Sequence, residues 1–121
     1  MTEKLQIEAR RVGPTTAVLV VLGPLDAATV PTLLAEGAGL VDAGHCNLVL
    51  DLTSVASCDA AAAGVFLDLH QLARNLSGQV VLTGIRGLVQ RQLERTAVIG
   101  TLRTTLNTRD ALIMLGTAGT G

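Results

Sequence analysis

The chain has almost no aromatic side chains. Of its 121 residues only Phe66 is aromatic, and tryptophan and tyrosine are missing. Proteins that bind single-stranded nucleic acid stack the bases on aromatic rings, so this scarcity argues against that function. The formal net charge of −1 also gives no electrostatic footprint for DNA or for an acidic membrane. We therefore expect no direct nucleic-acid partner. The arginines nevertheless crowd the second half of the chain, which a solvated face explains or, alternatively, a weakly basic patch on one side.

Long apolar runs and a cysteine framework are missing as well. No apolar run approaches the roughly 20 residues that a membrane span requires, and the opening MTEKLQIEARR lacks the apolar core of a signal peptide. Two cysteines, Cys46 and Cys58, do not make a disulfide framework, and an extended strand between them would hold them too far apart to bond. These features predict a cytoplasmic protein with reduced thiols.

What the chain does have is apolar content for a core. Hydrophobic residues make up 49% of it, and its length suits one ordinary domain. We expect a single domain over residues 1–121, in which the small and polar residues 116–121 form a flexible tail.

The apolar pattern predicts an α/β fold. Strands are expected from Leu5 to Val12 and over 17–22, 47–51, 79–83 and 102–106. In the first of them apolar residues, including Ala9, alternate with polar ones, so one face of that strand is expected to be buried. Gly23-Pro24 should end the second strand, and a polar bend over 51–54 should follow the third. Helices are expected from about 30 to 43, from Asp59 to Leu76, over 88–96 and over 109–115. The order predicts a small mixed, mainly parallel sheet of four or five strands packed by about four helices.

The third strand and the helix after it form the stretch around which the chain is organised. Asp59 is placed to cap this helix, because its carboxylate can accept bonds from free N–H groups of the first turn. Spacing predicts that Val65, Leu69, Leu72 and Leu76 face inward. The flat turn of alanines 60–63 has two interpretations: it packs on the chain's own sheet, or it lets another protein approach closely.

Two further helix positions are predicted. Ala97 is expected to face inward at the end of the helix over 88–96, and Thr108 is expected to be the N-cap of the last helix.

Three acids follow strands, as catalytic or Mg²⁺-binding acids often do. They are Asp26, Asp51 and Asp59. No glycine-rich phosphate loop or lysine accompanies them, so structural caps and turns are the favoured interpretation. His45, Cys46 and His70 lack the spacing of a zinc site. We therefore predict no metal, no cofactor and no enzymatic activity.

Four local patterns occur in an order that resembles one family. They are Gly23-Pro24-Leu25-Asp26, the run from Leu48 to Val55, the run from Cys58 to Leu67, and Leu93-Glu94-Arg95-Thr96. Asp110-Ala111-Leu112 near the end fits as well. Together they resemble the STAS domain of bacterial anti-sigma factor antagonists, over nearly the whole chain.

The chain departs from that family at the position that matters most for control. The serine after the aspartate is the family's phosphate acceptor, and here Ala60 occupies its place. Ala61 and Ala62 replace the serine and glycine that follow. Ser54 and Ser57 lie upstream, displaced from the helix start, so we expect no phosphorylation at either.

The resemblance implies a binding module. STAS antagonists bind an anti-sigma factor, a serine-kinase-type ATPase, so that it releases its sigma factor. The loop after the third strand and the first turn of the next helix would make the contact. The residues expected there are Asp26, Ser57, Cys58, Asp59, Ala60, Ala61, Ala62, Ala63 and Leu67.

Two alternatives remain open. The chain could be a non-phosphorylated STAS accessory or scaffold subunit of a transporter ATPase or a signalling complex, or a domain that keeps the fold without the partner. The unpaired edge of a small sheet also makes a homodimer plausible.

Overall fold

The computed structural model describes residues 5–116 of the chain. The elements are β1 (Gln6–Arg11), β2 (Thr16–Leu25), α1 (Val30–Asp42), β3 (Asn47–Cys58), α2 (Ala60–Asn75), β4 (Gln79–Thr83), α3 (Gly87–Glu94), α4 (Val98–Thr101), β5 (Arg103–Thr105) and α5 (Thr108–Met114).

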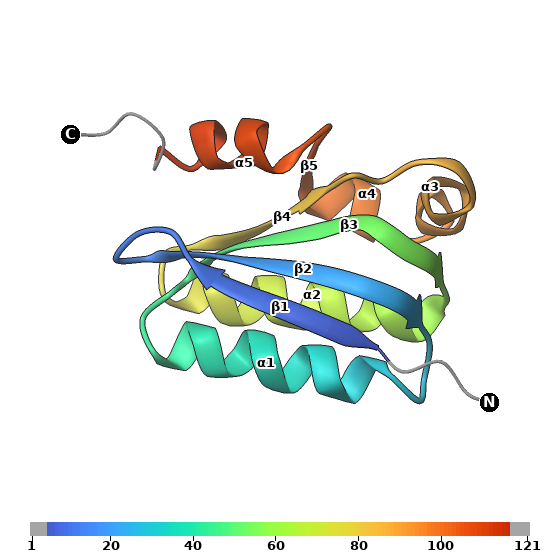
Figure 1. Cartoon of the computed structure of the whole chain (residues 1–121), viewed down its shortest axis with the longest axis horizontal. Coiled ribbons are helices and arrows are strands. Elements are labelled where there is room, and N and C mark those ends of the chain that lie inside the picture. The colour runs from blue at the N-terminus through green and yellow to red at the C-terminus, as the bar shows by residue number, and fades with distance from the viewer. Residues whose placement is uncertain (1–4, 117–121) are drawn as a thin grey trace.

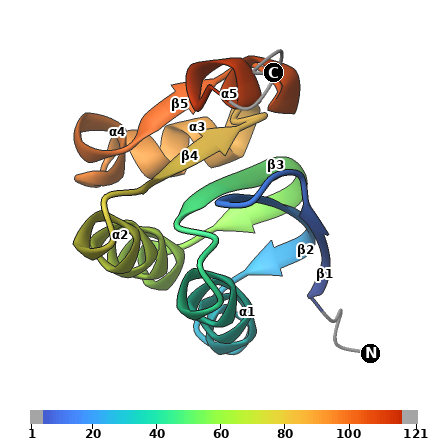
Figure 2. The same cartoon turned by 90° about the vertical axis from the view of Figure 1, so that its left-hand side faces the viewer.

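The strands form one five-stranded sheet in the order β1-β2-β3-β4-β5. β1 pairs antiparallel with β2, and the other neighbouring pairs are parallel. α1 and α2 lie side by side against one face of the sheet, and α5 lies over the other (Figure 1, Figure 2). The predicted α/β class with a mixed, mainly parallel sheet is confirmed.

Alternation along the strands divides the core into two parts. In β3, Leu48, Leu50 and Leu52 belong to the large cluster that also contains Phe66 of α2. Val49 points to the opposite face because successive side chains of a strand alternate. There it joins Val18, Val81 and Ala111 in a smaller cluster. The sheet therefore has a thick apolar layer under α1 and α2 and a thin one under α5.

α1 and α2 approach closely at Gly37. A Cβ atom at this position would lie 2.7 Å from Leu69 Cδ2, which is closer than such atoms pack. A glycine in mid-helix weakens the helix by about 1 kcal/mol relative to alanine, and here it allows close contact with α2.

The second and third strands are longer than predicted. β2 continues through Pro24 to Leu25, and β3 continues through the expected polar bend to Cys58. Pro24 lies within a register shift between Gly23 and Leu25, past Leu22, the last residue of β2 that pairs with β1. A proline at such an irregularity removes no ladder bond. The extension of each strand gives the other a partner.

The buried stripe of α2 also differs from the prediction. Leu72 is 38% exposed and Leu76 is 53% exposed. Val65 and Leu69 are buried, as predicted. Ala62, Phe66 and Ala73 are also buried and lie on one helix face with Leu69. Leu72 lies beside this stripe, and Leu76 lies past the last helical residue.

Three predictions near the chain ends need correction. Ala9 is exposed because no helix covers β1, the edge strand. Ala97 is exposed and Val98 is buried in its place. Asn107, not Thr108, caps α5, because its side chain accepts a bond from Asp110 N at 2.8 Å. Of the predicted tail, residues 117–121 lie outside the described part of the chain.

Candidate docking surface at the start of α2

The ends of β2 and β3 bring two of the predicted site residues to one edge of the sheet. Leu25 pairs with Cys58, and Asp59 N donates to Leu25 O at 3.1 Å. Asp26 and Asp59, which follow these two residues, therefore leave the sheet at neighbouring points. No separate loop joins β3 to α2, because Asp59 is the only residue between them.

All three acids serve the backbone. Asp59 Oδ1 accepts bonds from Ala61 N at 2.9 Å and Ala62 N at 3.3 Å. Asp26 Oδ1 accepts bonds from the N–H groups of residues 28 and 29 at 2.9 and 3.1 Å. Asp51 Oδ1 accepts a bond from Thr53 N at 3.0 Å. Structural caps and turns, the interpretation favoured from the sequence, describe these contacts.

The structure divides the predicted contact residues between surface and core. Asp59 and Ala60 are exposed, and Asp26, Ser57, Ala61 and Leu67 are half-buried. The side chains of Cys58, Ala62 and Ala63 are buried and belong to the main core cluster. The inner side of the alanine turn packs on the core, as the first interpretation predicts. Its outer side lies open to solvent, and close approach by another protein stays a prediction.

A hollow of about 500 Å³ separates the start of α2 from α3. Its α3 side had no place in the sequence prediction of the site. Gln92 Oε1 accepts a bond from Cys58 N at 2.8 Å and so ties α3 to the end of β3. The hollow is lined by Cys58, Asp59, Ala60, Leu88, Arg91, Gln92, Arg95 and Thr96. The signal that could have revealed this side is the number of arginines in the second half of the chain.

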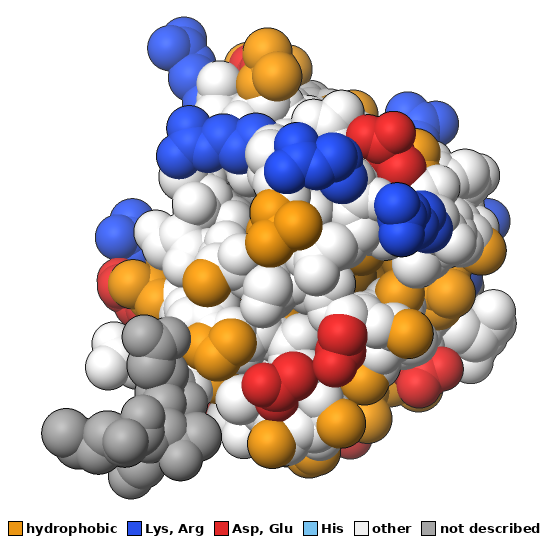
Figure 3. Space-filling model, turned by 90° about the vertical axis from the view of Figure 1, so that its right-hand side faces the viewer, with side chains coloured by type: hydrophobic (Ala, Val, Ile, Leu, Met, Phe, Trp, Pro, Cys, Tyr) orange, Lys and Arg blue, Asp and Glu red, His pale blue; other side chains and the backbone are white. Residues whose placement is uncertain are grey.

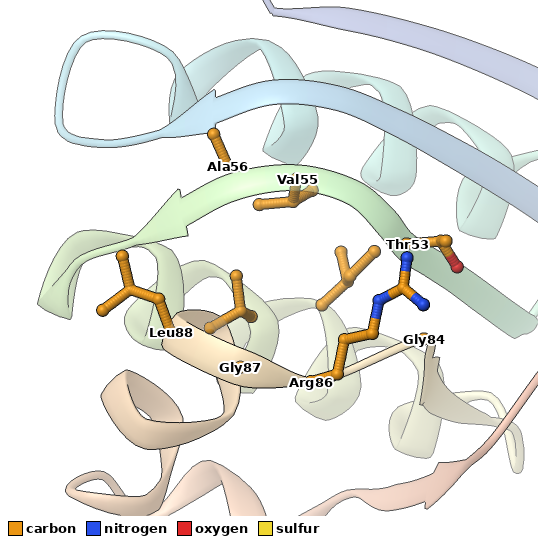
Figure 4. A pocket seen from close by; sticks show the side chains of 9 residues that line it. Thr53, Val55, Ala56, Gly84, Arg86, Gly87 and Leu88 are labelled. Atoms are coloured by element: carbon orange, nitrogen blue, oxygen red, sulfur yellow. The ribbon is translucent and has the colours of Figure 1, made fainter.

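A second hollow lies between β3 and α3 (Figure 4). β4 ends at Thr83, which pairs with Asp51, so no strand lies beside β3 after that residue on this side. Arg86 extends across the hollow toward Thr53 in Figure 4. Leu88 lines this hollow as well as the first, so the two adjoin.

Metal ligands do not gather in the described part of the chain: no group of three or more His, Cys, Asp or Glu residues lies close enough to hold an ion. His70 has a structural contact instead, since its Nδ1 accepts a bond from Val80 N at 3.1 Å. Burial, and then the neighbouring Arg74, lower the pKa of His70. The neutral ring that accepts this bond is thereby favoured.

The two cysteines are free thiols near opposite ends of β3. Burial raises the pKa of the Cys58 thiol to about 12, and the carboxylate of Asp59 adds to this effect. A helix start can activate a thiol, but Cys58 at neutral pH stays protonated and acts as a small apolar side chain.

We expect Cys58 to make the protein lose stability in alkali. In the unfolded chain the thiol ionises near pH 9.0, whereas in the folded chain it stays neutral up to about pH 12. Between these values the unfolded state alone loses the proton, so the free energy of unfolding should fall by about 1.4 kcal/mol per pH unit. Below pH 9 this group contributes no pH dependence. Urea unfolding at a series of pH values measures the slope, and the Cys58→Ala variant should lack this part of it. An equal slope in both proteins would contradict the assignment.

Within the described residues, no helix is long and apolar enough to cross a bilayer. A model of the STAS domain family matches residues 6–111, and the chain belongs to that family. Its fold is that of the anti-sigma factor antagonists. No curated protein sequence matches the chain.

Three solved structures illustrate the likeness. An anti-sigma factor antagonist from Mycobacterium paratuberculosis has a TM-score of 0.83 and 18% identity, covering 93% of this chain and 95% of that one. The anti-sigma factor antagonist SpoIIAA in its unphosphorylated form has a TM-score of 0.78 and 14% identity, covering 92% and 97%. The murine anion transporter Slc26a9 has a TM-score of 0.73 and 14% identity, covering 85% of this chain and 18% of the transporter. At such identities the likeness shows the fold alone.

Proposed function

We propose that this protein is an anti-sigma factor antagonist that docks an anti-sigma factor of the kinase-like ATPase class through the start of α2. The observation that carries the proposal is the exposed pair Asp59 and Ala60, where a capped helix begins at the surface. A rigid, nearly flat turn lets a partner backbone approach closely with little loss of entropy on binding. The protein would then be a binding module that acts in the cytoplasm, not an enzyme.

The contact residues divide into two roles under this proposal. Asp59, Ala60 and Ala61 would touch the partner, with Asp26, Ser57 and Leu67 at the rim. The side chains of Cys58, Ala62 and Ala63 are buried, so they would support the surface from beneath.

The usual phosphorylation switch would be missing. Ala60 carries a methyl group and no oxygen to which a phosphoryl group could be transferred. Ser54 and Ser57 belong to β3 and precede the helix cap, so neither occupies the acceptor position at the start of α2. Control would instead come from the amount of protein, from the partner's nucleotide state, or from a second STAS protein competing for the same partner.

A second candidate function has one observation in its favour. The transporter Slc26a9 contains a region with this fold, so an accessory or scaffold role in a transport or signalling complex would also suit a STAS domain without an acceptor serine. Homodimer formation through β1 or β5, the two edge strands, remains a prediction.

The test uses purified kinase-like anti-sigma factors and transporter ATPases from the source organism. We expect one of the anti-sigma factors to bind the full chain and to release its sigma factor. We also expect no phosphate to be transferred to residues 54–61 when ATP is supplied, as mass spectrometry would show. Binding to a transporter ATPase alone would favour the second candidate. Phosphate found at Ser54 or Ser57 would overturn the loss of the switch.

A further inference from the structure

Helix α3 presents three kinds of side chain on three sides. Val89 and Leu93 are buried and face the core. Leu88, Arg91 and Arg95 recur at spacings of three and four residues, so they share a second side. These three line the hollow beside the start of α2. Gln90 and Glu94 line a different hollow, beside β5. The arginine side of α3 therefore faces the candidate docking surface.

Within residues 5–116, the arginines on this side form no ion pair with an acidic side chain. Among the described residues the only ion pair joins Arg10 to Glu8, far along the chain. Arg91 and Arg95 are four residues apart at the end of α3, so their like charges repel each other. Asp59 is the one acid that lines the hollow, and its Oδ1 is bonded to the backbone of α2.

Arg86 adds a further positive charge to the adjoining hollow. Between the arginines lies Leu88, which is 49% exposed. Figure 3 shows that basic side chains gather over one half of this end of the molecule. Three cations thus border two adjoining hollows that share the exposed Leu88. We call this surface the arginine groove: Ala60, Arg86, Leu88, Arg91 and Arg95.

We propose that the arginine groove binds an acidic segment of the partner protein, with an apolar side chain of that segment seated on Leu88. This inference rests on the proposed function and names the chemistry of the partner at that site. Arginine binds carboxylates through paired N–H donors, and a leucine between the arginines favours an amphipathic peptide. Single-stranded nucleic acid fits poorly, because no aromatic side chain lines the groove to stack a base.

The first experiment selects peptides from a displayed random library on the wild-type chain. Enriched peptides should combine Asp or Glu with Leu or Ile, and their affinity should fall as salt rises. The double variant Arg91→Glu and Arg95→Glu should weaken binding roughly a hundredfold, about tenfold for each reversed contact. Arg11→Glu with Arg74→Glu is the matched control, since these exposed arginines lie outside the groove. That control should bind the peptides as the wild type does.

Chemical-shift changes in the isotope-labelled protein then locate the bound peptide. The largest changes should occur at residues 58–60 and 86–96. The inference is overturned if no peptide is enriched or if the enriched peptides lack acidic residues. It is also overturned if the groove variant and the control variant bind the peptides equally well.

The same variants separate this inference from the proposed function. An anti-sigma factor that binds the wild type and the Arg91→Glu, Arg95→Glu protein equally would leave the function in place and remove the groove. If acidic peptides bind in the groove but no anti-sigma factor binds the chain, the groove inference stands and the proposed function fails. Circular dichroism must show the same melting behaviour for both double variants.

Discussion

Replacing Ala60 with glutamate should abolish tight binding to the anti-sigma factor, weakening it by about a hundredfold or more, which corresponds to roughly 2.7 kcal/mol. The new side chain would place a negative charge and added bulk at the exposed start of α2, much as a phosphate does in an interface. The fold should be unaffected, because residue 60 is exposed and an acid in the first turn suits the helix dipole. Isothermal titration calorimetry with the purified partner measures the change.

Two variants make this result specific. Ala35→Glu adds the same charge at another exposed alanine, on α1, and should bind as the wild type does. Ala60→Ser restores a hydroxyl and should keep the affinity while allowing phosphate to be transferred from ATP. If Ala60→Glu and Ala35→Glu bind equally well, the partner docks elsewhere on the molecule.

Replacing Phe66 with alanine should lower the free energy of unfolding by about 3–5 kcal/mol. Phe66 is fully buried in the main core cluster between the sheet and the two long helices. A domain of this size is stable by only about 5–15 kcal/mol, so the variant should melt roughly 10–20 °C lower. Urea unfolding must be followed by far-ultraviolet circular dichroism, because the chain has no tryptophan or tyrosine to serve as a fluorescent probe.

Leu72→Ala is the control for this prediction. It truncates a large side chain on the same helix, but one that is partly exposed, so the change should be below about 1.5 kcal/mol. Comparable losses in the two variants would mean that Phe66 is not central to the packing of α2.

Local signals predicted much of the fold. The run Gln79–Thr83 is a strand with the expected bounds, because it is short and rich in valine and has no helical spacing of apolar residues. Asp59 caps α2 because the bond needs only residues two and three positions away. The lengths of β2 and β3 could not be read in this way. Each continues past its breaker residues because the other lies beside it, and that pairing joins residues far apart in the chain.

The candidate site shows the same limit. The sequence predicted where α2 begins, because the Asp59 cap depends only on neighbouring residues. It did not identify α3 as the opposite wall, because the bond from Cys58 N to Gln92 spans 34 positions. The arginines were visible as a group, but their common direction required both the helical spacing and the position of α3 against β3.

The cap at Asp59 has an evolutionary consequence. It fixes the start of α2 through a side chain that precedes residue 60, so the folded scaffold does not depend on what residue 60 is. Every alanine codon becomes a serine codon through a single change of its first base. A lineage could therefore gain or lose reversible control of such a protein in a single mutational step, while its architecture and its contact surface are inherited unchanged.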